Sequence, residues 1–289
     1  MNSSFSVMDE DRLHRSLEIL SAIFPSFVVF MVAGVVATLT GVLSFAAILR
    51  SKEMKSKFYA LYVEMAVVDF LMGVSYVFTA TRKIYRLKSR EGDVMERSTC
   101  CQESAILYFS QTLGLYVAFT LAIDRTVSFV RPVAYKYLKP VYITLPLIVA
   151  AWAFSILETA IMVSAGSSPA FFAQEILISC GTASCWSIPS YFATLYSHLA
   201  ISGFVVLLNF CLIFVAKSLM KEAIKRKAVS NLTEDERRLR SQNHFQMKVI
   251  KTLSVMVVSH ATSHISSRLL LVVLLHLYHE DPELTVLAD

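Results

Sequence analysis

Long stretches without an ionised side chain constrain this chain more than any other feature. No Asp, Glu, Lys or Arg occurs in three stretches, Ile19–Leu49, Ser104–Ile123 and Ile176–Ala216. A fourth stretch, Pro140–Gln174, contains only Glu158. A helix of about 20 apolar residues crosses the hydrocarbon core of a bilayer. The sequence therefore predicts a protein that crosses the membrane several times.

The composition excludes an ordinary soluble domain and favours helices over a barrel. Charged residues make up 17% of the chain, against roughly 25% in soluble domains. Backbone groups in lipid must pair internally, which allows only helices or a closed barrel. Barrel strands are about 10 residues long and alternate in polarity, unlike these continuous runs. We therefore predict an all-α, polytopic membrane helix bundle. Its six predicted spans are about Ile23–Leu49, Phe58–Thr81, Ala105–Ile123, Val141–Ala165, Tyr191–Ala216 and Val249–Leu277.

The distribution of Lys and Arg sets the predicted orientation. These residues are frequent in the segments after the first, third and fifth spans, and the loop between the fourth and fifth spans has none. Because cytoplasmic loops are enriched in Lys and Arg, we expect residues 1–22 to form an extracellular tail and residues 278–289 an extracellular stub. The six basic residues between the second and third spans depart from this pattern. We therefore attribute the net charge of +5 to membrane topology. We expect the protein to contact the lipid bilayer and not nucleic acid.

Two pairs of cysteines fall on the predicted outer side. Cys100 and Cys101 lie at the outer mouth of the third span, and Cys180 and Cys185 lie in the loop before the fifth. A disulfide persists on this oxidising side, and it would hold the long loop over the bundle. Which of the adjacent cysteines pairs is left open by the sequence. Asn2 begins a triplet that accepts a glycan on an outward tail.

Several motifs together resemble the rhodopsin-like (class A) G-protein-coupled receptors. Asp124-Arg125-Thr126 resembles the Asp-Arg-Tyr triplet at the inner end of helix three in that family. Pro132 and Tyr135 follow the Asp by eight and eleven residues, as they do there. Cys100 stands at the family's spacing for its disulfide cysteine, and the stretch ending in Asp69 is similar to the second-helix pattern. Trp152 and the start of the sixth span also match.

The sequence departs from this family in four respects. The fifth predicted span lacks the family's proline, and Thr126 replaces the usual tyrosine. In the sixth, His260, His264 and Ser266 stand where Phe, Trp and Pro are usual. A seventh span with the family's Asn-Pro-x-x-Tyr segment does not follow, which we interpret as truncation. The divergent sixth span is similar to nematode-type serpentine chemoreceptors.

The resemblance implies a seven-transmembrane receptor fold and a signalling function without catalysis. A receptor of this family binds an extracellular ligand, here a small chemosensory molecule or a peptide, and acts on a heterotrimeric G protein from the plasma membrane. Asp69 would bind a sodium ion or a proton as a switch, and no other cofactor or metal is implied. The residues implied to meet the G protein are Asp124, Arg125, Arg131, Pro132 and Tyr135.

The sixth predicted span carries a polar stripe. His260, His264 and Arg268 are spaced by four residues and so share one helix face. One interpretation is a stripe that faces the bundle interior and is satisfied by water and neighbouring helices. The other, more specific interpretation is that the stripe lines a ligand pocket. The residues predicted to line this pocket are Tyr108, Gln111, His264, Ser267 and Arg268.

Two other classes of protein stay open at this point. A six-helix transporter or channel would use Glu64, Asp69, Glu158 and the histidines of the sixth span as an ion or proton relay. An intramembrane metalloenzyme would use His260 and His264, whose spacing is familiar from zinc sites, but no third ligand is evident. Within a receptor, Glu158 is a candidate to pair across the bundle with Arg268.

Overall fold

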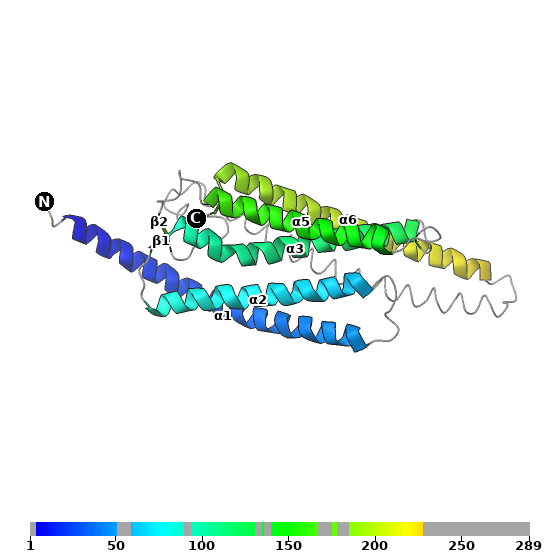
Figure 1. Cartoon of the computed structure of the whole chain (residues 1–289), viewed down its shortest axis with the longest axis horizontal. Helices are drawn as coiled ribbons and strands as arrows, with labels where there is room; N and C mark the ends of the chain where they lie inside the picture. The colour runs from blue at the N-terminus through cyan, green and yellow to red at the C-terminus, as the bar shows by residue number, and fades with distance from the viewer. Residues whose placement is uncertain are drawn as a thin grey trace.

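The computed structural model describes residues 4–50, 59–89, 94–130, 135, 140–166, 175–177 and 185–227. Figure 1 shows that its long elements are helices and that its strands are short. The helices are α1 (Ser4–Arg50), α2 (Tyr59–Ser89), α3 (Arg97–Val130), α5 (Pro140–Gly166) and α6 (Ile188–Lys227). The two strands are β1 (Val94–Glu96) and β2 (Glu175–Leu177).

Five of the described helices are long and apolar enough to cross a membrane. This confirms the predicted all-α, polytopic class. The sixth predicted span, residues 249–277, lies outside the described residues, as do Asn2 and the predicted stub. Helix α1 extends into the predicted tail, since it begins at Ser4. The five candidate spans are Phe27–Arg50, Ala60–Tyr85, Arg97–Val130, Tyr142–Ala165 and Pro189–Val215.

Helix α3 lies at the centre of the described bundle and packs against α2, α5 and α6. Its side chains Leu113, Val117 and Leu121 are buried in one core cluster with residues of the three surrounding helices. Outward-facing apolar side chains such as Phe154 and Phe214 are exposed, which suits a surface in contact with lipid. The central position explains why α3 carries most of the buried polar residues described below.

Helices α1 and α2 approach each other closely and run side by side in Figure 1. A Cβ atom added at Gly34 would lie 2.8 Å from the carbonyl oxygen of Gly73 and 2.9 Å from the Cβ of Tyr76. Both distances are too short for real contacts, so only glycine fits at Gly34. Small residues of this kind let helix backbones pack closely in membranes.

The end of the bundle where α3 begins is tied together by three different links. Strands β1 and β2 pair antiparallel, with Val94 opposite Leu177, and lie at that end in Figure 1. A disulfide joins Cys101 to Cys185, with Cα atoms 5.4 Å apart. The buried guanidinium of Arg97 donates a hydrogen bond to the carbonyl of Trp186 at 2.9 Å.

The disulfide decides between pairings that the sequence left open. Cys185 pairs with Cys101, so it is not the partner of Cys100. Neighbouring side chains on a helix point in directions about 100° apart, and only the path of the loop decides which of the two is met. Cys100 is disulfide-bonded as well. Cys180 lies outside the described residues.

Candidate functional site

A buried acid, a buried base and a tyrosine lie in contact near the C-terminal end of α3, the end that the sequence predicts to face inward. The hydroxyl of Tyr135 donates to both carboxylate oxygens of Asp124, at 2.9 and 3.1 Å. An Nη atom of Arg125 lies 3.6 Å from the same carboxylate. The side chain of Asp124 is fully buried and that of Arg125 is 7% exposed. A buried ion pair depends on such extra hydrogen bonds to offset its lost hydration.

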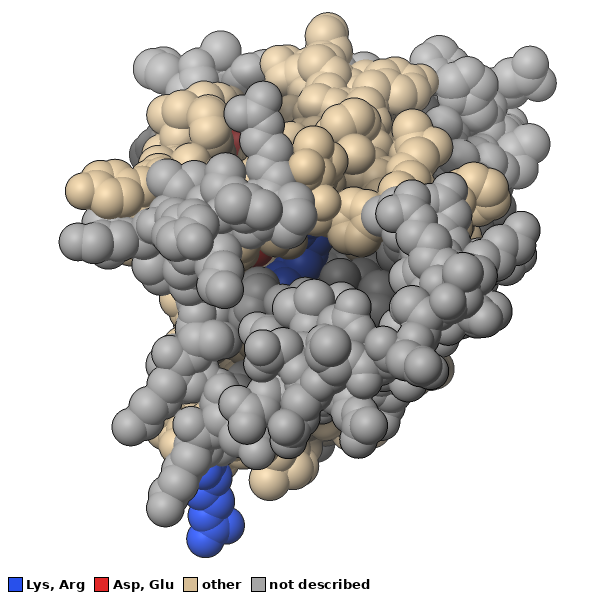
Figure 2. All heavy atoms as spheres, turned by 90° about the vertical axis from the view of Figure 1, so that its right-hand side faces the viewer, with Lys and Arg blue, Asp and Glu red and all other residues tan. Residues whose placement is uncertain are grey.

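Neighbouring elements complete this inner cluster of Asp124, Arg125 and Tyr135. Tyr62 of α2 interacts electrostatically with Arg125, and buried Thr144 of α5 contacts Tyr135. Burial first, and then the negative charge of Asp124, raise the pKa of the Tyr135 hydroxyl above its ordinary value. The hydroxyl therefore remains a donor at physiological pH. Figure 2 looks at this end of the molecule and shows basic and acidic surface within a central hollow.

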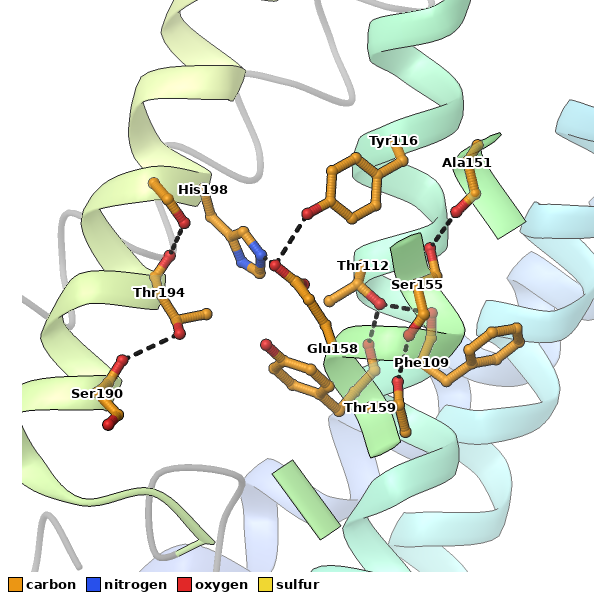
Figure 3. Close-up of polar contacts among 12 residues, drawn as sticks. Phe109, Thr112, Tyr116, Ala151, Ser155, Glu158, Thr159, Ser190, Thr194 and His198 are labelled. Atoms are coloured by element: carbon orange, nitrogen blue, oxygen red, sulfur yellow. Dashed lines mark hydrogen bonds and ion pairs between the residues drawn. The ribbon is translucent and has the colours of Figure 1, made fainter. Parts of the chain in front are cut away.

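A second polar cluster joins three helices in the half of the bundle that the sequence predicts to face outward. The hydroxyl of Tyr116 on α3 donates to one carboxylate oxygen of Glu158 on α5, at 2.8 Å. Nε2 of His198 on α6 lies 3.0 Å from the other oxygen. Figure 3 shows both groups pointing at the same carboxylate. The side chain of His198 is fully buried and that of Glu158 is 22% exposed.

Aromatic rings pack around this outer cluster of Tyr116, Glu158 and His198. The ring of Tyr108 stacks on that of His198, with centroids 6.4 Å apart. The ring of Trp186 also lies beside Tyr108, with centroids 6.1 Å apart. Trp186 follows the disulfide cysteine Cys185 in sequence, so the tied loop reaches down to these rings. Tyr108 belongs to a buried core cluster with both disulfide cysteines. The imidazole thus lies beside two aromatic rings, those of Tyr108 and Tyr116.

The sequence did not point to His198, and it suggested another partner for Glu158. A stretch free of Asp, Glu, Lys and Arg can still contain a histidine, and His198 lies in such a stretch. The useful signal was the coincidence of one acid in the fourth predicted span with one histidine in the fifth. Arg268, the partner suggested for Glu158, lies outside the described residues.

Some of the remaining predicted residues lie in the described part of the chain and others lie outside it. Gln111 is half-buried and lies one turn from Tyr108 on the same face of α3, and Asp69 is half-buried within α2. Glu64 is buried in α2 and interacts with Trp152. Among the described residues, no three His, Cys, Asp or Glu side chains are grouped to hold a metal. The predicted residues outside the described part are Arg131, Pro132, His260, His264, Ser267 and Arg268.

Comparison with known families identifies a family of membrane-spanning receptors. Residues 40–287 match the family described as 7 transmembrane receptor (rhodopsin family). The match covers most of the chain and extends from α1 to beyond the last described helix. A search of curated proteins found no match.

Proposed function

Because the chain belongs to the rhodopsin family of seven-transmembrane receptors, we propose that it is a G-protein-coupled receptor of the plasma membrane. In this role its N-terminus faces outward, an extracellular ligand binds the outer half of the bundle, and a heterotrimeric G protein binds the inner end. The observation that carries the proposal is the inner cluster, a buried Asp124–Arg125 pair fixed by Tyr135. As in other members of the family, the protein itself performs no catalysis.

The inner cluster suits a switch between two arrangements of the bundle. At 3.6 Å, the Arg125–Asp124 contact is longer than a hydrogen bond. Tyr135 and Thr144 hydrogen-bond Asp124 independently of Arg125. A rearrangement can therefore turn the guanidinium of Arg125 toward a partner without leaving Asp124 unpaired. A ligand drives this change only if it binds one arrangement more tightly than the other.

The ligand site is proposed at the outer half of α3, where Tyr108 and Gln111 share a face. The described surroundings of Tyr108 support this choice, since the disulfide-tied loop brings Trp186 against its ring. Such aromatic walls suit a ligand with an apolar body. We assign the remaining polar contacts to the sixth predicted span, through His264, Ser267 and Arg268.

Asp69 is proposed as the ion or proton switch. It is half-buried within a membrane-spanning helix, where a carboxylate is costly unless it holds a partner or a cation. The same reasoning underlies the transporter alternative, in which Glu64, Asp69 and Glu158 form a relay. The family match favours the receptor, and no contact between these three carboxylates is described.

Replacement of Arg125 tests the proposed function. Arg125→Ala should abolish G-protein activation while the protein still reaches the cell surface, because the variant removes the cation offered to the partner. Arg82→Ala is the matched control, since Arg82 forms an exposed ion pair with Glu103 at the opposite end of the bundle. Full G-protein activation by Arg125→Ala at normal surface expression would refute the role given to Arg125.

A further inference from the structure

Helix α6 contacts one of its neighbouring helices much more than the other. It packs along α3 but makes few contacts with α5. Among the described side chains, a hydrogen bond between His198 of α6 and Glu158 of α5 links the two helices. Tyr116 extends the same link to α3 through the other carboxylate oxygen. One carboxylate thus connects three helices, and the strength of its bonds affects how firmly α6 is held.

His198 is an unusual residue for such a link because it is fully buried and uses only one ring nitrogen. Nε2 faces the carboxylate of Glu158, and Nδ1 has no hydrogen-bond partner in the described part of the chain. A histidine is the side chain whose charge changes between about pH 5 and pH 8. The imidazole therefore has a carboxylate opposite one nitrogen and a buried second nitrogen to which no described group bonds.

We infer that His198 and Glu158 form a proton-binding site that fastens α6 to α5 and, through Tyr116, to α3. With a neutral imidazole, Nε2–H donates to the carboxylate. When the pair gains one proton, the imidazole becomes an imidazolium and the same contact becomes an ion pair. The added positive charge lies opposite the carboxylate, and opposite charges attract more strongly where the dielectric constant is low. The proton-bound state therefore holds α6 more firmly.

Glu158, at 22% exposed, is the more accessible member of the pair. No bond between heavy atoms forms or breaks. Glu158 lies eight residues before the end of α5, or about 12 Å of helix from the outer side. The ionisable groups that face the pair from described elements are Tyr108 and Tyr116 of α3. Both are phenols with ordinary pKa values near 10, so neither changes charge in the range where histidine does.

This inference goes beyond the proposed function, because it concerns the packing of α6 and needs neither a ligand nor a G protein. The test uses the full chain in lipid nanodiscs and follows thermal unfolding between about pH 5 and pH 8. The variants Glu158→Gln and His198→Gln keep polar side chains but remove the titrating pair. Ser110→Ala is the matched control, since it breaks the buried hydrogen bond between Ser75 and Ser110 that links α2 to α3.

The wild-type midpoint should rise by about 2–4 °C as the pH falls and the site fills. Both Gln variants should lose this component of the pH dependence, whereas Ser110→Ala should melt at a lower temperature with the wild-type pH dependence. Gln variants whose midpoints rise with falling pH as much as the wild-type midpoint would overturn the proposal. So would a wild-type midpoint that is insensitive to pH.

A second measurement decides the matter if the Gln variants do not fold. Tyr116→Phe keeps both members of the pair and removes only the hydroxyl bonded to Glu158. In protein labelled with nitrogen-15 at histidine, one imidazole should titrate with a midpoint that differs between the wild type and Tyr116→Phe. Identical histidine titrations in the two proteins would contradict the site.

Discussion

Removal of the Tyr135 hydroxyl is the sharpest perturbation of the inner cluster. Tyr135→Phe keeps the buried ring and deletes only the donor that bonds Asp124 at 2.9 and 3.1 Å. Asp124 is fully buried, so water does not replace the lost donor. Arg125 still lies 3.6 Å from the carboxylate, which limits the penalty.

The expected cost follows from the charge on the acceptor. A hydrogen bond to a charged group contributes about 1.5–3 kcal/mol to the free energy of unfolding. For a chain of this size, that corresponds to a fall in the melting temperature of about 3–12 °C. Because burial raises the pKa of Tyr135, the hydroxyl is protonated below its ordinary pKa of about 10. The difference between Tyr135→Phe and wild type should therefore be the same at about pH 7 and pH 9.

The assay is thermal unfolding of purified protein in nanodiscs, with Tyr142→Phe as the control. Tyr142 is on α5 and 69% exposed, so loss of its hydroxyl should change the melting temperature by little. If Tyr135→Phe and Tyr142→Phe melt at the same temperature, the hydrogen bonds to Asp124 do not stabilise the fold and our account of the inner cluster fails.

Three further predictions concern the packing and the outer end of the bundle. Gly34→Ala should destabilise the protein by about 1–3 kcal/mol through overpacking. Gly203→Ala is the control and should be neutral or stabilising, because the added Cβ has open space around it. Equal melting temperatures for the two variants would refute the close packing of α1 and α2. The double change Cys101→Ser and Cys185→Ser should lower stability by about 2–4 kcal/mol, which would be measured as a lower midpoint of thermal unfolding than that of the wild type without reductant. Arg82→Ala removes an exposed ion pair and should shift stability by less than about 1 kcal/mol.

The fold was largely predictable because a lipid environment leaves few choices. Charge-free stretches of sufficient length have to be helices, so five described helices appear where the sequence placed spans. The spacing of Asp124 and Tyr135 also carried information, since the structure brings the two side chains together. Family membership was confirmed by the match over residues 40–287.

What the sequence left out depends on contacts between distant helices. The choice of Cys101 over Cys100 for Cys185 is decided by the path of a loop, and spacing along the chain does not encode it. The β1–β2 pair is too short to leave a pattern. His198 and Glu158 are 40 residues apart, and only the packing of α6 beside α3 and α5 makes them neighbours.

The central claim is that this chain activates a G protein through the inner end of its helix bundle. The most direct test is guanine-nucleotide exchange on a panel of purified heterotrimeric G proteins, with the chain reconstituted in nanodiscs. We predict that the wild-type chain accelerates exchange on at least one G protein and that Arg125→Ala does not. Equal exchange with the wild type, with Arg125→Ala and with empty nanodiscs, across the whole panel, would contradict the account.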